Sequence, residues 1–289
     1  MTIKPMVAAL SALMLVACGS DDDSSSNDTK TQDISLKFSA SVGADAVVCG
    51  ANTTLVGTGD GGNGTAPDIK DFRLYVSSVQ VATDSGEFVD LELTASDWQQ
   101  DNVALLDFED QTSSCTTGTA ETRLVVEGTA PEADYTRVRF TVGVPEELNH
   151  LNQETATSPL NLSGLYWSWA GGYKHARIDV TGWNIHLATT GCTLDDNNEN
   201  LDCTDARPNR PTYTLDNVDL TSSTIDFDYA QLVDGADIST DTGGATGCMS
   251  SATDPECQAI FTNLGLDLTT GQCLDSTDGC DAQTWVTVK

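Results

Sequence analysis

Histidine is scarce in this chain, and its few positions narrow the choice of chemistry. There are three histidines: His150 follows a predicted strand and the turn 145–149, while His175 and His186 fall in two consecutive strand candidates. An imidazole nitrogen is a common ligand of transition metals. One isolated histidine is more often a surface residue or a hydrogen-bonded core residue. A metal site is therefore indicated only if two of the three converge.

The residues around two of these histidines predict which face of a strand each occupies. In 183–188 the odd-numbered positions are apolar, so His186 points to the opposite, polar face. In 174–180 His175 shares its face with two charged residues, Arg177 and Asp179. Both imidazoles are therefore expected beside polar groups.

Tryptophan is concentrated in the same part of the chain. Three of the five tryptophans lie in 167–183, and Trp167 and Trp169 would share one face of an extended segment. Packing in an aromatic core explains at least one of the two. The other is free to take part in a site.

The cysteines predict disulfides and an oxidising compartment. The chain has nine, and setting Cys18 aside leaves eight, which can pair in roughly a hundred ways. Absence of any CxxC pair argues against a zinc ribbon. Spacing favours three short loops and one long bridge. The expected pairs are Cys49–Cys115, Cys192–Cys203, Cys248–Cys257 and Cys273–Cys280.

Other chemistries find little support. Neither G-x-S-x-G nor H-E-x-x-H occurs, and carboxylates are too abundant for any pair to indicate a hydrolase. The acidic stretch 195–202 could bind Ca²⁺ but lacks EF-hand spacing, so a solvated loop is favoured. The Gly-rich segment 57–64 lacks the lysine of a phosphate loop. A formal charge of −31 argues against nucleic-acid partners. We expect a protein that is not an enzyme.

The N-terminal residues predict export. Residues 1–17 combine Lys4 with a short apolar run, as a signal peptide does. The run ends in LVAC, which is typical of a lipobox, so Cys18 is expected to be lipidated. Residues 18–33 then form a lipid anchor and a disordered polar tether. This predicts a periplasmic or cell-surface protein, held at the outer membrane by its lipid anchor only.

Alternating apolar residues predict an all-β fold over 34–289. Period-2 alternation recurs in many short segments separated by Gly, Asn, Asp and Pro, as in a β-sandwich. The best helical signal is 255–264, with Asp254 as N-cap and Pro255 at its first position. The sequence therefore predicts one disulfide-stapled β-sandwich domain with long loops and little helix.

Several motifs together resemble those of the MbnP-like family, also called the metallo-mystery pair four-Cys motif family. They are GLYWSWAGGYKHARIDV (164–180), IHLATTGC (185–192) with RPNRP (207–211), and FTVGVPEELNH (140–150). Further matches are KFSASVGADAVVCG (37–50), DFRLYVSSVQV (71–81), VDLEL (89–93) and VALLDFED (103–110). They run in family order over nearly all of 34–220. The four motif cysteines would be Cys49, Cys115, Cys192 and Cys203.

The resemblance implies an exported, copper-binding protein. Its family members are paired with a di-heme cytochrome c peroxidase-like (MauG-type) enzyme. In studied relatives that enzyme oxidises a tryptophan to kynurenine, which helps a histidine to hold copper. The motifs carry copper binding onto His150 and His186, and the oxidation onto Trp167 or Trp169. We favour Trp169, because two glycines follow it closely.

The donor inventory agrees with this implication. Copper sites use thiolate, thioether or imidazole, and the mature chain retains a single methionine, Met249. Imidazole, with an amine derived from tryptophan, is what remains. His175 stands where the family has an aromatic residue, usually Phe, so its role as a ligand stays open. Two other functions remain: a structural or adhesion-type surface sandwich that binds Ca²⁺, and a two-carboxylate hydrolase.

Overall fold

The computed structural model describes most of the chain. The described residues are 30–57, 64–168, 170–197, 200–275 and 279–289. The predicted signal peptide, the lipidated Cys18, most of the predicted tether and Trp169 lie outside them.

Short strands dominate the chain. In order the elements are β1 (Thr31–Val42), β2 (Asp45–Ala46), β3 (Gly50–Ala51), β4 (Asp68–Ala82), β5 (Val89–Asp90), β6 (Glu92–Leu93), β7 (Gln99–Gln100), β8 (Val103–Asp107), β9 (Val125–Pro131), β10 (Arg137–Val142), α1 (Glu146–Asn149), η1 (Ser163–Leu165), β11 (Tyr166–Ser168), β12 (Gly172–Val180), β13 (Trp183–Ala188), β14 (Thr193–Leu194), β15 (Leu201–Asp202), β16 (Thr212–Leu215), β17 (Ile225–Asp228), α2 (Tyr229–Leu232), α3 (Cys257–Asn263) and β18 (Val286–Val288).

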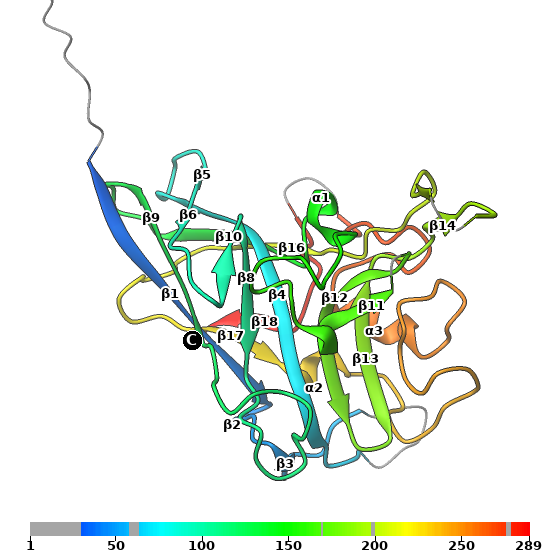
Figure 1. Cartoon of the computed structure of the whole chain (residues 1–289). Coiled ribbons are helices and arrows are strands. Elements are labelled where there is room, and N and C mark those ends of the chain that lie inside the picture. The colour runs from blue at the N-terminus through cyan, green and yellow to red at the C-terminus, as the bar shows by residue number, and fades with distance from the viewer. Residues whose placement is uncertain (1–29, 58–63, 169, 198–199, 276–278) are drawn as a thin grey trace, which may run out of the picture.

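Two sheets face each other. One has the order β18-β17-β1-β9-β6, with β2 beside β1. The other has the order β11-β12-β4-β10-β16, and β13 extends it beyond β12 while β8 pairs with β4. Figure 1 shows β4 crossing the middle of the molecule with β12 and β13 beside it. The predicted all-β sandwich with little helix is confirmed.

Aromatic rings fill the space between the two sheets. Phe38 of β1 meets Phe140 of β10 edge to face, with ring centroids 5.7 Å apart, and stacks on Phe227 of β17 at 6.0 Å. All three are buried. Alternation along each strand sends these side chains inward, and burial of such rings is a large share of the stability of a core.

The outer face of the larger sheet is also covered. Tyr75 of β4, Leu105 of β8 and Tyr173 of β12 form a second buried cluster with Val144 and Leu165 from the connection that follows β10. Because this connection packs on the sheet, β4 is buried on both faces. Charged side chains on the outer face of β4 are therefore removed from water.

Four disulfides cross-link the described chain. The bonded pairs are Cys49–Cys115, Cys192–Cys203, Cys248–Cys257 and Cys273–Cys280. The predicted pairing is therefore confirmed. Each short bridge closes a loop beside the sandwich, and the long bridge ties the residue before β3 to the loop after β8.

Two predicted boundaries are wrong. β1 begins at Thr31, inside the stretch predicted to be tether, because residues 31–33 pair with β9 through backbone groups that need no apolar side chain. Helix α3 begins at Cys257 with Glu256 as its N-cap residue. Asp254 instead accepts hydrogen bonds from the backbone N–H groups of Met249 and Glu256.

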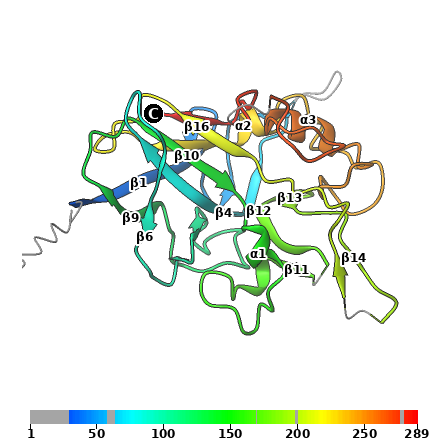
Figure 2. The same cartoon turned by 90° about the horizontal axis from the view of Figure 1, so that it is seen from above.

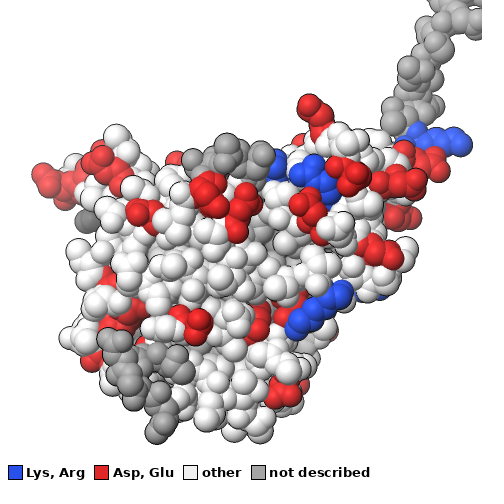
Figure 3. Space-filling model, turned by 180° about the vertical axis from the view of Figure 1, so that it is seen from behind, with Lys and Arg blue, Asp and Glu red and all other residues white. Residues whose placement is uncertain are grey.

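The surface carries acidic groups widely. Figure 3 shows Asp and Glu scattered over one face, with few Lys and Arg among them. Figure 2 shows β1 and β9 at one end of the molecule and the β14 loop projecting at the other. In the described part of the chain, no helix has the length and apolar character needed to cross a membrane.

Candidate metal centre

A tight hairpin presents Trp167 at the surface. β11 pairs with the start of β12, with Tyr166 opposite Tyr173 and Ser168 opposite Gly172. Gly172 has φ +66°, and a Cβ there would lie 2.4 Å from Asn149. Only glycine fits this close approach in a left-handed conformation. The turn therefore holds Trp167 at the edge of the sheet, where 39% of its surface is exposed.

Trp167 lies against His186. Their ring centroids are 5.9 Å apart and the rings are nearly perpendicular, at 88°. His186 comes from β13, where it pairs with Arg177 of β12. Its face is the polar one that the alternation in 183–188 predicts, because Trp183 and Ile185 point into the core. The structure thus places one predicted tryptophan beside one predicted histidine.

His186 is hydrogen-bonded to the carboxylate of Asp179, which strand alternation had placed only on the face of His175. The Nε2 atom lies 2.8 Å from Oδ1 of Asp179, which is nearly buried on β12. Burial opposes ionisation of Asp179, but the hydrogen bond and charge of His186 and the charge of Arg177 hold the pKa of its carboxyl below its usual range. The signal in the sequence was the diagonal position of Asp179 relative to His186 in the β12–β13 hairpin.

A row of buried charges continues from this pair across the sheet. Arg177 contacts Asp179 at 2.7 Å and Asp71 at 3.2 Å, and Asp71 pairs with Arg73 of the same strand. Asp107 of β8 lies opposite Arg73, and burial raises the pKa of its carboxyl to about 8. Opposite charges alternate from Asp179 to Arg73, which offsets the cost of removing each from water.

His150 occupies a different setting. It follows α1, and its Nε2 atom lies 3.8 Å from Sγ of Cys192 and 3.7 Å from Sγ of Cys203. The ring lines a cavity of about 220 Å³ together with Glu146 and Arg210. Both sulfurs belong to one disulfide, so they are not available as thiolates. The His150 imidazole is the soft donor that this cavity offers.

The two predicted ligand histidines flank the same hairpin. Asn149, adjacent to His150, accepts a hydrogen bond from the backbone N–H of Tyr173 at 3.1 Å. His186 meets the hairpin through Trp167. The imidazoles of His150 and His186 therefore have different neighbours. That both bind one metal ion stays a prediction.

His175 is a core residue. A β-bulge between Lys174 and Ala176 interrupts the alternation of β12. Consequently Lys174, and not His175, reaches the Gly164 carbonyl that Arg177 also contacts. The prediction that His175 shares a face with Arg177 is therefore wrong.

Both ring nitrogens of His175 have partners. Nδ1 accepts from the Val144 N–H at 3.2 Å, and Nε2 lies 3.2 Å from the Pro208 carbonyl and 3.1 Å from Oγ1 of Thr189. Burial and the charge of Arg210 lower the pKa of this imidazole to about 3. His175 is committed to hydrogen bonds within the fold and offers no free nitrogen to a metal.

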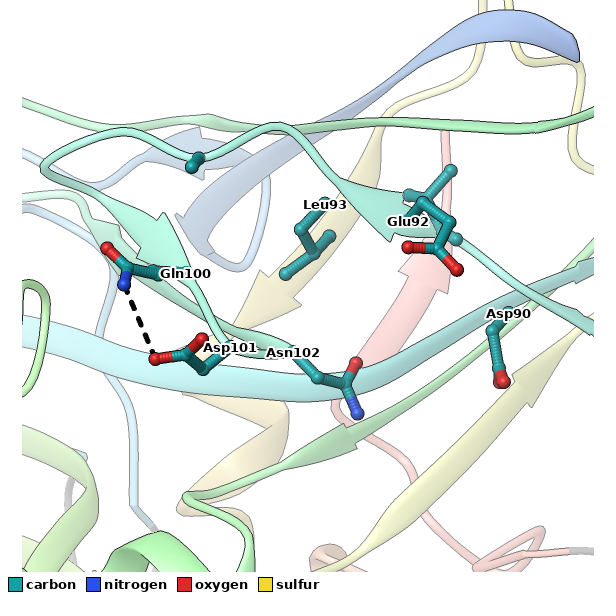
Figure 4. Close-up of a pocket in the computed structure, with 8 residues that line it drawn as sticks. Asp90, Glu92, Leu93, Gln100, Asp101 and Asn102 are labelled. Atoms are coloured by element: carbon teal, nitrogen blue, oxygen red, sulfur yellow. Dashed lines mark hydrogen bonds between the residues drawn. The ribbon is translucent and has the colours of Figure 1, made fainter. Parts of the chain in front are cut away.

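Four further hollows are lined by described residues that do not include a histidine. One of them, about 610 Å³, is lined by acidic and amide side chains such as Asp90, Glu92 and Asn102 (Figure 4). In the acidic loop, Asp195 accepts hydrogen bonds from its neighbours Asn197 and Asn200. Within the described ranges, every group of three close metal-binding side chains includes a disulfide.

Comparisons with known proteins agree on one family. The family model described as MbnP matches residues 31–250. A solved structure, MbnP from Methylosinus trichosporium, is 29% identical and has a TM-score of 0.75, covering 90% of this chain and 98% of its own. No curated protein matches the chain.

Proposed function

Because the chain belongs to the MbnP family, we propose that it binds copper outside the cytoplasm and is the substrate of a di-heme enzyme. In this proposal residues 1–17 direct export, and lipidated Cys18 anchors the protein at the outer membrane, in the periplasm or at the cell surface. The protein is not itself an enzyme. The observation that carries the proposal is the contact between the exposed Trp167 and the imidazole of His186.

The donors in the described chain suit copper. The eight cysteines of the sandwich are in disulfides, so thiolates are excluded. Half-buried imidazoles remain at His186 and His150, and Cu(I) accepts such ligands. We propose that both hold the ion, with a third donor from the modified tryptophan. The bound copper ion would be cargo that the protein carries.

We propose Trp167 as the oxidised residue, in place of Trp169. Trp167 is partly exposed, and its ring centroid lies 5.9 Å from that of His186, a proposed ligand. Exposure lets an electron leave toward the heme of a docked partner without direct contact with iron. Opening of the indole ring between its C2 and C3 atoms then leaves an aryl amine beside His186. Water supplies the oxygen atoms, the lost ring carbon departs as formic acid, and four electrons pass to the oxidised hemes of the partner while four protons leave to solvent.

Peptide mass tests the oxidation. The protein would be co-expressed with an exported protein that carries two CxxCH heme-attachment motifs. The peptide containing Trp167 should gain about 4 Da, the net exchange of one carbon for one oxygen. Trp167→Phe should abolish this gain, and Trp98→Phe, at another partly exposed tryptophan, should leave it intact. A gain confined to Trp169 would overturn the choice of Trp167.

Titration with Cu(I) tests the ligands. The co-expressed protein should bind one equivalent, and His150→Ala and His186→Ala should each weaken binding at least tenfold, since one donor is lost. His175→Gln should leave the stoichiometry unchanged. If both ligand substitutions leave the affinity at its original value, copper binds elsewhere. A protein that binds Ca²⁺ and no copper would favour the adhesion-type alternative.

A further inference from the structure

The hydrogen bond between His186 and Asp179 determines which ring nitrogen carries the proton. An ionised carboxylate can only accept hydrogen bonds. With Oδ1 of Asp179 at 2.8 Å, the neutral imidazole must therefore carry its hydrogen on Nε2. Its lone pair is then on Nδ1, and no hydrogen bond of the described chain uses that atom.

Asp179 is itself held in place. Its other oxygen, Oδ2, accepts from Nε of Arg177 at 2.8 Å and lies 2.7 Å from Nη2 of the same guanidinium. These two contacts to one oxygen favour the charged carboxylate, and together with the contact between Oδ1 and His186 they orient it. Arg177 is fixed in turn by Asp71, whose side chain is buried. The carboxylate thus has one oxygen for Arg177 and the other for His186.

The same guanidinium reaches the segment that carries Trp167. Nη1 of Arg177 donates to the Gly164 carbonyl at 3.2 Å, and Lys174 approaches this carbonyl at 3.4 Å. Gly164 belongs to η1, which leads directly into β11 and Trp167. Arg177 therefore contacts both Asp179, the hydrogen-bond partner of His186, and the segment that leads to Trp167.

We infer that Asp179 is the positioning residue of His186: it fixes the ring as the Nε2–H tautomer and leaves Nδ1 as the nitrogen that binds the metal. This rests on the proposed function for the identity of the ion, but the tautomer is independent of copper. Carboxylates that accept from the second nitrogen of a ligand histidine commonly tune metal sites in this way. Arg177 in turn orients Asp179.

Long-range ¹H–¹⁵N correlation of the imidazole nitrogens tests the inference in metal-free, ¹⁵N-labelled protein. Wild-type His186 should appear as the Nε2–H tautomer. Asp179→Asn should introduce the Nδ1–H form, because the amide can donate to Nε2, and Asp179→Glu should restore part of the wild-type pattern. Asp216→Asn is the matched control, since it removes an exposed carboxylate that also pairs with an arginine.

Cu(I) additions to the co-expressed protein complete the test. The Nδ1 resonance of His186 should shift, and Asp179→Asn should weaken binding about 10- to 100-fold, with Asp216→Asn unchanged. A wild-type Nδ1–H tautomer, or a copper shift at Nε2, would overturn the inference. If no copper binds while the tautomer depends on Asp179 as described, the proposed function fails and the positioning role stands.

Discussion

Single residues in this fold carry charge where water is excluded. The row from His186 to Asp107 crosses four strands. Its charges alternate in sign from Asp179 to Arg73, with the His186 imidazole at one end and the Asp107 carboxyl at the other. A buried charge without a partner is costly, so each member depends on the next. His175 avoids the cost of a buried charge in another way: it is buried as a neutral ring, with both nitrogens in hydrogen bonds. That difference gives the two histidines different roles.

Acid should destabilise the protein through His175. The pKa of this ring falls to about 3 in the fold, against about 6.5 in an unfolded chain. The contribution of neutral His175 to the free energy of unfolding is complete above pH 6.5 and is lost as the pH falls toward 3. The reason is that this histidine binds a proton in the unfolded chain but not in the folded protein. At pH 4.5 the loss should be about 2 to 3 kcal/mol relative to pH 7.5.

Urea unfolding at both pH values measures this loss. His175→Gln retains an acceptor for Val144 and a donor for Pro208 but does not titrate. Its unfolding free energy should therefore change less between the two pH values than that of the wild type. Equal changes in the two proteins would show that His175 is not the acid-sensitive group.

Among the elements, the β11–β12 hairpin decides where the candidate site lies. Its turn brings Trp167 to the sheet edge, and its second strand supplies Arg177 and Asp179. The turn is possible because Gly172 lets Asn149 pack against the backbone. The geometry of the site thus depends on one glycine and on one amide from helix α1, 23 residues earlier in the chain.

Two glycines that both have a positive φ test the role of this turn. Gly172→Ala should destabilise the protein by about 3 kcal/mol, because a left-handed alanine is strained and its Cβ would collide with Asn149. Gly182→Ala is the matched control: φ is +84°, but no atom lies within 4 Å of a Cβ there. It should cost about 1 to 2 kcal/mol.

Thermal and urea unfolding would compare the two variants. Copper affinity after co-expression gives a second measurement, which Gly172→Ala should reduce and Gly182→Ala should leave unchanged. Equal destabilisation by both substitutions would mean that the contact with Asn149 does not determine the turn.

At the scale of the whole molecule, the folded body extends beyond the residues that match the family model. That match ends at residue 250, yet Trp285 is fully buried in the main core. Its ring centroid lies 4.9 Å from that of Phe227, and Nε1 donates to the hydroxyl of Tyr213 at 2.7 Å. β18, which begins next to it, pairs with β17. The C-terminal segment completes the sandwich.

Trp285 should therefore be important for folding. Trp285→Ala should lower the unfolding free energy by about 3 to 5 kcal/mol, since it leaves a large cavity and removes the hydrogen bond that Nε1 donates to the Tyr213 hydroxyl. Trp285→Phe should cost less, because it keeps most of the ring. Trp98→Ala, at a half-buried tryptophan, is the control and should cost less still. A Trp285→Ala variant as stable as the control would show that the buried Trp285 ring is dispensable for folding.

Local patterns in the sequence were enough to predict the class of fold. Alternation is a property of an extended backbone with one face in the core, so 183–188 was predicted to the residue as β13. Short spacings between cysteines made their pairing readable because a close pair closes the smallest loop. The motifs also identified the family, since WSW and its neighbours are contiguous in the chain.

Tertiary structure decided which of those residues can act together. The bulge that sends His175 into the core depends on the strands that pair with β12, and alternation alone cannot reveal it. Asp179 becomes the partner of His186 because a hairpin places them diagonally, while Arg177 is fixed by Asp71 from a strand about a hundred residues away. Hydrogen bonds and ion pairs act over a few ångströms in space. Sequence determines which donors exist, and the packing of distant strands determines their neighbours.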